Sequence, residues 1–105
     1  HVVDLARGHL KALEHLQSAS GGVSIYNLGA GTGYSVLDVL HAYEKACGKP
    51  LPYVICPRRA GDIAVCYCDA SKAKRELGWQ AQKTLDDMCA DSWRWQSMNP
   101  YGYEV

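Results

Sequence analysis

The alternation of helical and extended stretches most constrains the fold of this chain of 105 residues. Four stretches carry apolar residues at three- and four-residue steps, which is typical of amphipathic helices. Between them lie short apolar runs, predicted to be strands at residues 24–28, 50–56 and 64–68. So few strands cannot form a sheet with both faces covered. We therefore predict an α/β lobe, with four helices and two or three short strands, that packs against a larger part outside this chain.

Turn residues indicate where the first and third helices begin and end. Asp4 is expected to cap the first helix. The third should begin at Asp69 or Ser71 and stop at Gly78, with Trp79 packing back over its last turn. The apolar stripe of the first helix, expected to cover a sheet, consists of Ala6, Leu10, Leu13 and Leu16.

Capping boxes predict the starts of the second and fourth helices. Ser35 with Asp38, and Thr84 with Asp87, have the three-residue spacing of this motif. Gly48 is expected to end the second helix. One face of the second helix is expected to consist of Val36, Leu40, Tyr43 and Cys47. The buried stripe of the fourth is expected to consist of Leu85, Met88, Ser92 and Trp95 or Gln96. The fourth should end at residues 99–100, and the tail 101–105 is expected to be loose.

The composition excludes several classes of partner. Eleven basic and eleven acidic residues cancel, so no global field should recruit nucleic acid or an anionic membrane. No apolar run has the length of a membrane span and no secretory signal is visible, so a cytoplasmic protein is expected. Five cysteines without a Cys-x-x-Cys spacing favour reduced thiols. Cys66 and Cys68 have no histidine nearby, so no metal site is expected.

One segment, residues 57–62, has the local chemistry of a nucleotide site. Arg58 and Arg59 offer guanidinium groups that can bind phosphate oxygens in pairs, and Asp62 offers acceptors for sugar hydroxyls. Gly61 allows the backbone to approach a ligand closely. The alternative is a surface loop whose two arginines are merely solvated.

The glycines of residues 29–33 follow an extended run and precede a helix, as in a dinucleotide-binding fingerprint. That motif requires a third glycine where this sequence has Tyr34, and an acidic residue about 20 positions later. Here the next extended run is followed by Arg58 and Arg59. The pattern therefore favours a glycine turn that lines a substrate cleft.

Six segments, taken together in order and spacing, resemble the last third of the UDP-glucose 4-epimerase family, in the extended branch of the short-chain dehydrogenase/reductases. The resemblance covers nearly the whole chain. The segments are residues 1–6 (HVVDLA), 25–36 (IYNLGAGTGYSV), 57–62 (PRRAGD), 69–73 (DASKA), 76–79 (ELGW) and 93–96 (WRWQ).

The resemblance implies an enzyme of galactose metabolism that interconverts UDP-glucose and UDP-galactose at C4. Family members bind NAD in an N-terminal Rossmann domain and catalyse with a Tyr-x-x-x-Lys pair. No tyrosine of this chain has a lysine four positions later, so no catalytic or cofactor-binding residue is expected in it. Residues 1–105 are expected to be a C-terminal fragment that supplies the UDP-sugar site and is inactive alone. Family homodimers form through the N-terminal part.

Four residues of this chain match substrate-binding positions of the family. The resemblance assigns Arg59 to the diphosphate, Asp62 to the ribose hydroxyls and Val36 to the nucleotide. Cys66 lies where bacterial relatives often carry tyrosine, and its small thiol would leave room for an N-acetyl group. The implied substrates therefore include UDP-N-acetyl sugars. Two alternatives remain: a sister UDP-sugar dehydratase or decarboxylase, and a truncated UDP-binding module without catalysis.

Overall fold

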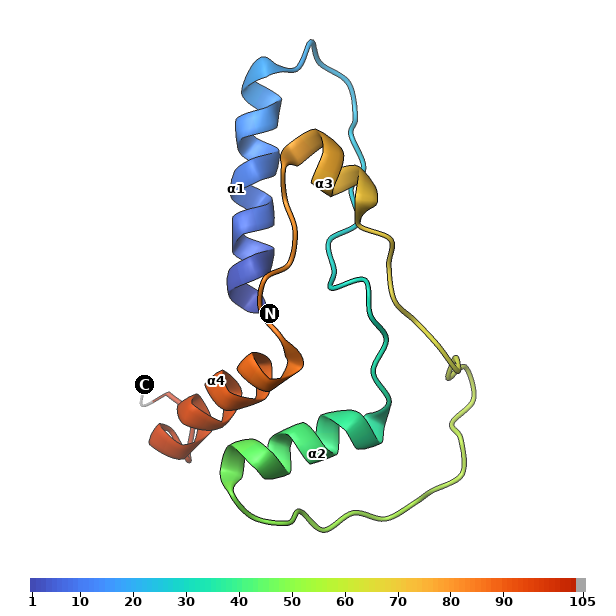
Figure 1. Ribbon diagram of the computed structural model, residues 1–105, viewed down its shortest axis with the longest axis vertical. Helices are drawn as coiled ribbons and strands as arrows, with labels where there is room; N and C mark the ends of the chain where they lie inside the picture. Colours follow the sequence, from blue (N-terminus) through green and yellow to red (C-terminus); the bar gives the residue numbers. More distant parts are fainter. Residues whose placement is uncertain (104–105) are drawn as a thin grey trace. The chain divides into compact units, whose positions relative to one another are not determined.

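The computed structural model describes residues 1–103 and contains four helices (Figure 1). This confirms the four predicted helices. Within the described residues, no helix is both long and apolar enough to cross a membrane. Residues 104–105 of the tail expected to be loose lie outside the described part. The helices are α1 (Val2–Ser18), α2 (Val36–Cys47), α3 (Ser71–Leu77) and α4 (Leu85–Met98).

The prediction of short strands is wrong, because residues 1–103 contain no strand. Residues 24–28, 50–56 and 64–68 form no strand there, and none of their backbone groups hydrogen-bonds to another backbone group. A strand is defined by such bonds to a neighbouring strand, so an apolar extended run without a neighbour remains irregular. Among the described residues, these runs have no neighbouring strand with which to form a sheet.

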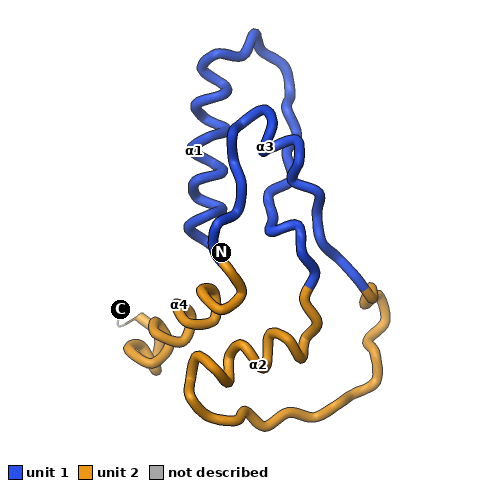
Figure 2. The backbone as a smooth tube through the Cα atoms, viewed as in Figure 1, with its two compact units in different colours: residues 1–33, 65–83 blue, residues 34–64, 84–105 orange. Residues whose placement is uncertain are grey.

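The chain divides into two compact units, each discontinuous in sequence (Figure 2). Unit 1 comprises residues 1–33 and 65–83, and therefore contains α1 and α3. Unit 2 comprises residues 34–64 and the described residues from 84 onward, with α2 and α4.

The core of unit 1 forms where α3 and Trp79, two residues beyond its end, meet α1. Ala73, Leu77 and Trp79 are its buried members, with relative exposures of 0, 7 and 5%. Gly8 is buried on α1, and a Cβ atom there would lie 3.3 Å from Trp79 Nε1 and 2.5 Å from Leu28 Cδ1. A residue without a side chain therefore lets the indole ring approach the helix.

The face that α1 turns toward this core differs from the prediction. Asp4 and Gly8 are buried on it and Ala12 is half-buried, four residues apart in each case. The predicted stripe is exposed instead, with Leu10, Leu13 and Leu16 at 60, 58 and 56%, and Ala6 exposed as well. The reason is that α1 has apolar residues on two sides, and only the side with small residues accommodates Trp79 in this unit.

Unit 2 is built on the packing of α2 against α4. The half-buried state of Leu40, Tyr43, Cys47, Leu85 and Met88 confirms those predictions. The predictions for the other positions of these two faces were wrong. The contact between the helices is centred on Ala42 and Cys89, which are 8 and 2% exposed and lie one residue from Tyr43 and Met88. Exposed instead are Val36 (86%), Ser92, Trp95 (39%) and Gln96.

Most of the predicted helix ends are confirmed. The Ser35 and Thr84 capping boxes are both complete. Gly48 and Gly78 end their helices in the left-handed conformation, and the Trp79 N–H donates to the Ala73 carbonyl at 3.2 Å. The exception is α1, because the ring of His1, not Asp4, accepts the backbone N–H of Val3 at 3.1 Å.

Candidate functional site

The segment predicted to bind the nucleotide forms a tight turn in unit 2. The backbone N–H of Asp62 donates to the carbonyl of Arg59 at 3.2 Å. Gly61 has φ of 86°, a left-handed conformation that residues with a side chain rarely adopt. Glycine is therefore required here by the turn, and the turn brings the two charged side chains at its ends together.

Arg59 and Asp62 form an ion pair across this turn. The Arg59 Nε group donates to Asp62 Oδ2 at 3.1 Å, and the Arg59 backbone N–H donates to the same oxygen at 3.3 Å. The Arg59 side chain is 86% exposed and that of Asp62 is 38% exposed. Solvent-exposed ion pairs of this kind contribute little to stability. The contact is better explained by its effect on orientation, because it holds the Arg59 guanidinium and the Asp62 carboxylate side by side.

The pair leaves its outer atoms available. Among residues 1–103, neither terminal amino group of the Arg59 guanidinium has a hydrogen-bond partner, and neither does Asp62 Oδ1. The guanidinium is held through one edge and presents the other to solvent. This arrangement can bind an anion at the arginine and a hydroxyl group at the aspartate.

The structure brings together two of the four predicted site residues. Val36 is the exposed first residue of α2 and, like Arg59 and Asp62, belongs to unit 2. Cys66 is an exposed free cysteine and, unlike the other three, belongs to unit 1. Arg58, the other arginine of this segment, is also exposed.

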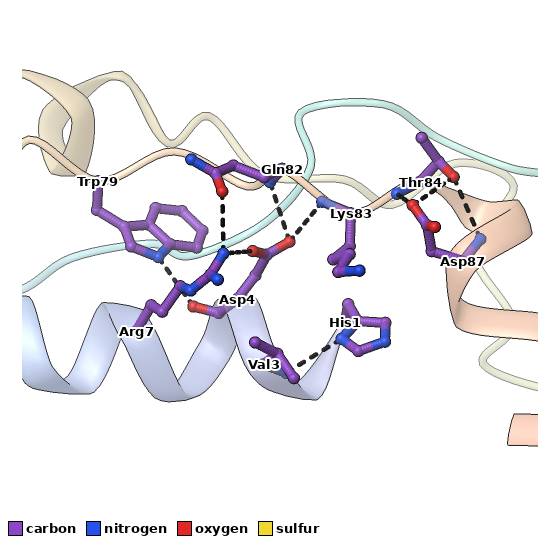
Figure 3. A network of polar contacts seen from close by, with 9 residues as sticks. All are labelled: His1, Val3, Asp4, Arg7, Trp79, Gln82, Lys83, Thr84 and Asp87. Atoms are coloured by element: carbon purple, nitrogen blue, oxygen red, sulfur yellow. Dashed lines mark hydrogen bonds and ion pairs between the residues drawn. The ribbon is translucent and has the colours of Figure 1, made fainter. Parts of the chain in front are cut away.

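Unit 1 builds a polar centre at Asp4 from both of its segments, and this centre was not predicted from the sequence (Figure 3). Asp4 is 2% exposed. Its Oδ2 atom accepts the backbone N–H groups of Gln82 and Lys83 at 3.0 and 2.8 Å, and its backbone carbonyl accepts Trp79 Nε1 at 2.9 Å. These bonds join the first turn of α1 to the segment that follows α3.

Asp4 is held as a carboxylate. Burial by itself raises the pKa of this carboxyl, but the N–H donors of Lys83 and Gln82 and the charge of Arg7 outweigh burial and lower the pKa below its ordinary value of 3.8. Arg7 Nη1 lies 3.7 Å from Asp4 Oδ1 and donates to Gln82 Oε1 at 2.9 Å. The one sequence feature that could indicate this polar centre is an aspartate within an apolar helix. By itself, that feature predicts a helix cap.

None of these groups forms a metal centre. Within residues 1–103, no three histidine, cysteine or acidic side chains are placed to bind an ion. The five cysteines are free thiols. The most buried of them is Cys89, and burial, with the charge of Asp86, raises the pKa of its thiol.

Comparison with known proteins gives strong sequence matches, although no family model matches the chain. It is 60% identical over 103 residues to the UDP-glucose 4-epimerase of Bifidobacterium longum, and 60% identical over 104 residues to that of Bacillus subtilis. It is 56% identical over 103 residues to the human UDP-glucose 4-epimerase. These matches cover 98 to 99% of this chain and 29 to 30% of the relatives.

Solved structures give the same result. The Bifidobacterium longum UDP-glucose 4-epimerase in complex with NAD+ and UDP matches 98% of this chain and 30% of that chain, with a TM-score of 0.92 and 60% identity. The Brucella ovis UDP-glucose 4-epimerase in complex with NAD matches 89% of this chain and 30% of that chain, with a TM-score of 0.76 and 35% identity.

In sequence and fold, the chain is similar to nucleotide-sugar epimerases. The particular relatives are UDP-glucose 4-epimerases, and the chain resembles their carboxyl-terminal third over nearly its whole length. It spans about 30% of the length of the curated relatives it matches.

Proposed function

We propose that residues 1–105 are the UDP-sugar-binding part of an NAD-dependent UDP-glucose 4-epimerase, which interconverts UDP-glucose and UDP-galactose in galactose metabolism. The 60% identity to an epimerase solved with NAD+ and UDP supports this assignment. The observation that carries it is the Arg59–Asp62 turn, which offers an anion site beside a hydroxyl acceptor.

Arg59 and Asp62 would hold the nucleotide. The free edge of the Arg59 guanidinium binds two diphosphate oxygens, while Asp62 Oδ1 accepts a hydrogen bond from a ribose hydroxyl. Asp62 Oδ2 keeps the arginine in place during binding. Val36 would add an apolar contact to the nucleotide. A firm hold on UDP leaves the sugar free to present either face of C4 to the reacting groups.

The redox chemistry belongs to a part outside the matched third. The glycines of residues 29–33 lack the third glycine and the acidic partner of a dinucleotide site, so these residues do not fit NAD. NAD supplies removal and return of the C4 hydride in such an epimerase. The residues of this chain would contribute orientation of the substrate, and we place NAD and the catalytic pair in the remaining portion.

Cys66 would widen the range of substrates. Its thiol is small and exposed, so it leaves space that a phenol ring would fill. We therefore include UDP-N-acetylglucosamine and UDP-N-acetylgalactosamine among the substrates. We also propose a cytoplasmic homodimer whose contact lies in the portion outside residues 1–105.

Titration of this chain with UDP, followed by two-dimensional amide NMR, tests the nucleotide site. We expect dispersed peaks to shift, and Arg59→Ala to weaken binding at least about tenfold, because a hydrogen bond to a charged group contributes roughly 1.5–3 kcal/mol. Arg58→Ala is the matched control and should change the affinity less than about threefold. Equal losses in both variants, or no UDP-dependent shift, would contradict the proposed site.

A further inference from the structure

Two glycines of unit 1 lie where another part of the same unit needs room. They belong to the glycine loop, which we define as residues 29–33. A Cβ atom on Gly29 would overlap the Cys68 Sγ atom, and one on Gly33 would lie 3.2 Å from Tyr67 Cδ1. Neither glycine has a positive φ, so the backbone alone would accept a side chain at both positions. The lack of a side chain at these positions is therefore explained by the contact.

The segment that meets the glycine loop, residues 65–68, is anchored at its carboxyl end. Beyond that end, Ala70 packs against the core of unit 1, and Asp69 Oδ1 accepts the Ser71 backbone N–H at 2.8 Å. Within residues 1–103, no backbone group of the segment hydrogen-bonds to another backbone group. Its contact with the glycine loop therefore provides the positioning that ladder hydrogen bonds provide in a strand.

Cys66 lies in this segment, on the side of Cys68 that faces away from the anchor. The two residues are two positions apart, which is at most about 7 Å along the backbone. Cys66 is exposed, whereas Cys68 is half-buried and lies against the glycine loop. Because Cys68 stands between the anchor and Cys66, a displacement of Cys68 also moves Cys66.

We propose that Gly29 and Cys68 are positioning residues for the sugar end of the substrate site. The Cys68 thiol rests on Gly29 and thereby sets where Cys66 lies, and Cys66 sets the room for the N-acetyl group. This inference rests on the proposed function, which places Cys66 beside the substrate. It adds two residues that act on sugar selection through Cys66.

The sizes of the two side chains decide whether this contact forms. A Cβ atom on Gly29 would lie 3.9 Å from Cys68 Cβ, which is an ordinary van der Waals distance. Gly29→Ala alone displaces the thiol, and Cys68→Ala alone leaves the space of the thiol empty. The double variant places two methyl groups in contact, so it restores the packing with different atoms.

Two-dimensional amide NMR of this chain tests the contact. Gly29→Ala and Cys68→Ala should each move the amide peak of Cys66, and the double variant should return it toward its position in the parent. The peak of Cys56 is the internal control, because Cys56 belongs to unit 2 and should stay in place. A Cys66 peak that ignores the single variants would overturn the inference. So would a peak that the double variant moves by the sum of the two single shifts.

Kinetics of the full-length enzyme test the consequence for sugar selection. Each single variant should lower kcat/KM for UDP-N-acetylglucosamine relative to UDP-glucose at least about threefold, because a misplacement of about 1 Å at a substrate site is costly. The N-acetyl sugar should suffer more, since it alone needs the space at Cys66. The double variant should recover the parent ratio. Asp4→Asn is the control, because it should weaken unit 1 but leave the ratio unchanged.

The two measurements separate this inference from the proposed function. If the Cys66 peak responds as expected while the substrate ratio stays constant in every variant, Cys66 has no role in sugar selection and the proposed function is wrong on that point. If the ratio falls in Asp4→Asn as far as in the Gly29 and Cys68 variants, loss of stability explains the change and the positioning role is overturned.

Discussion

At the scale of single residues, two aspartates illustrate how surroundings determine what a carboxylate does. Asp4 is 2% exposed, and its Oδ2 atom accepts two backbone N–H groups, so this buried carboxylate joins distant segments of unit 1. Asp62 is 38% exposed and shares one oxygen with Arg59, so its other oxygen remains available. The first is expected to contribute to stability and the second to binding.

Replacing Asp4 should destabilise unit 1 in a pH-dependent way. Asp4→Asn keeps the shape but removes the charge that accepts the Gln82 and Lys83 N–H groups, and we expect a loss of about 1–3 kcal/mol in the free energy of unfolding near pH 7. The folded pKa of Asp4 lies below 3.8, so its contribution is complete above that pH and is lost as pH falls through the folded pKa.

Urea unfolding between pH 7 and pH 2 measures this effect. The difference between the parent and Asp4→Asn should be constant at neutral pH and shrink below about pH 3.8. Asp86→Asn removes an exposed carboxylate of α4 and should leave the stability near that of the parent. A difference that stays the same across the whole range would show that the charge of Asp4 is not the cause.

At the scale of elements, each helix end is decided by residues within one turn. Thr84 accepts the Asp87 backbone N–H at 3.2 Å, and Asp87 Oδ2 accepts the Thr84 backbone N–H at 2.8 Å. Because these partners are three residues apart, the motif is visible in the sequence and forms without help from the rest of the chain. The same holds for the glycine that ends α3.

Removing the cap of α4 should lower the stability of unit 2. Thr84→Ala leaves the Asp87 N–H without its side-chain acceptor, and we expect a loss of about 1 kcal/mol, within a range of roughly 0.5–2 kcal/mol. Urea unfolding followed by circular dichroism gives this value. Ser97→Ala, at an exposed position near the other end of α4, is the control. A Thr84→Ala chain as stable as the control would contradict the role of the cap.

At the scale of the whole molecule, the substrate range can be measured only in a complete enzyme. Cys66→Tyr in the full-length protein should lower kcat/KM for the UDP-N-acetyl sugars by roughly 10- to 100-fold relative to UDP-glucose and UDP-galactose. The phenol would occupy the space of the N-acetyl group, and steric misfits of this size cost about 1–3 kcal/mol.

Cys56→Tyr is the control, because Cys56 is also exposed but belongs to unit 2. Kinetics with all four sugar nucleotides give the ratio. If Cys66→Tyr leaves that ratio at the value of the parent enzyme, Cys66 has no part in sugar selection.

The sequence by itself determined the four helices, both capping boxes and the glycine ends of α2 and α3. It also predicted that Arg59 and Asp62 act together in a nucleotide site, and the structure shows that these two residues meet across the turn at Gly61. All of these features depend on side chains within a few positions of one another. Short-range hydrogen bonds and backbone preferences act the same way in any surroundings, so they can be read in sequence order.

Only the tertiary structure decided which side of α1 faces the core and what Asp4 does. Both depend on Trp79 and the segment up to Lys83, more than 70 positions away in sequence. The predicted strands depend on distant segments in the same way, and among residues 1–103 their backbone groups have no backbone hydrogen-bond partners. An apolar pattern shows that a surface will be buried, but the partner that buries it is set by packing between distant segments.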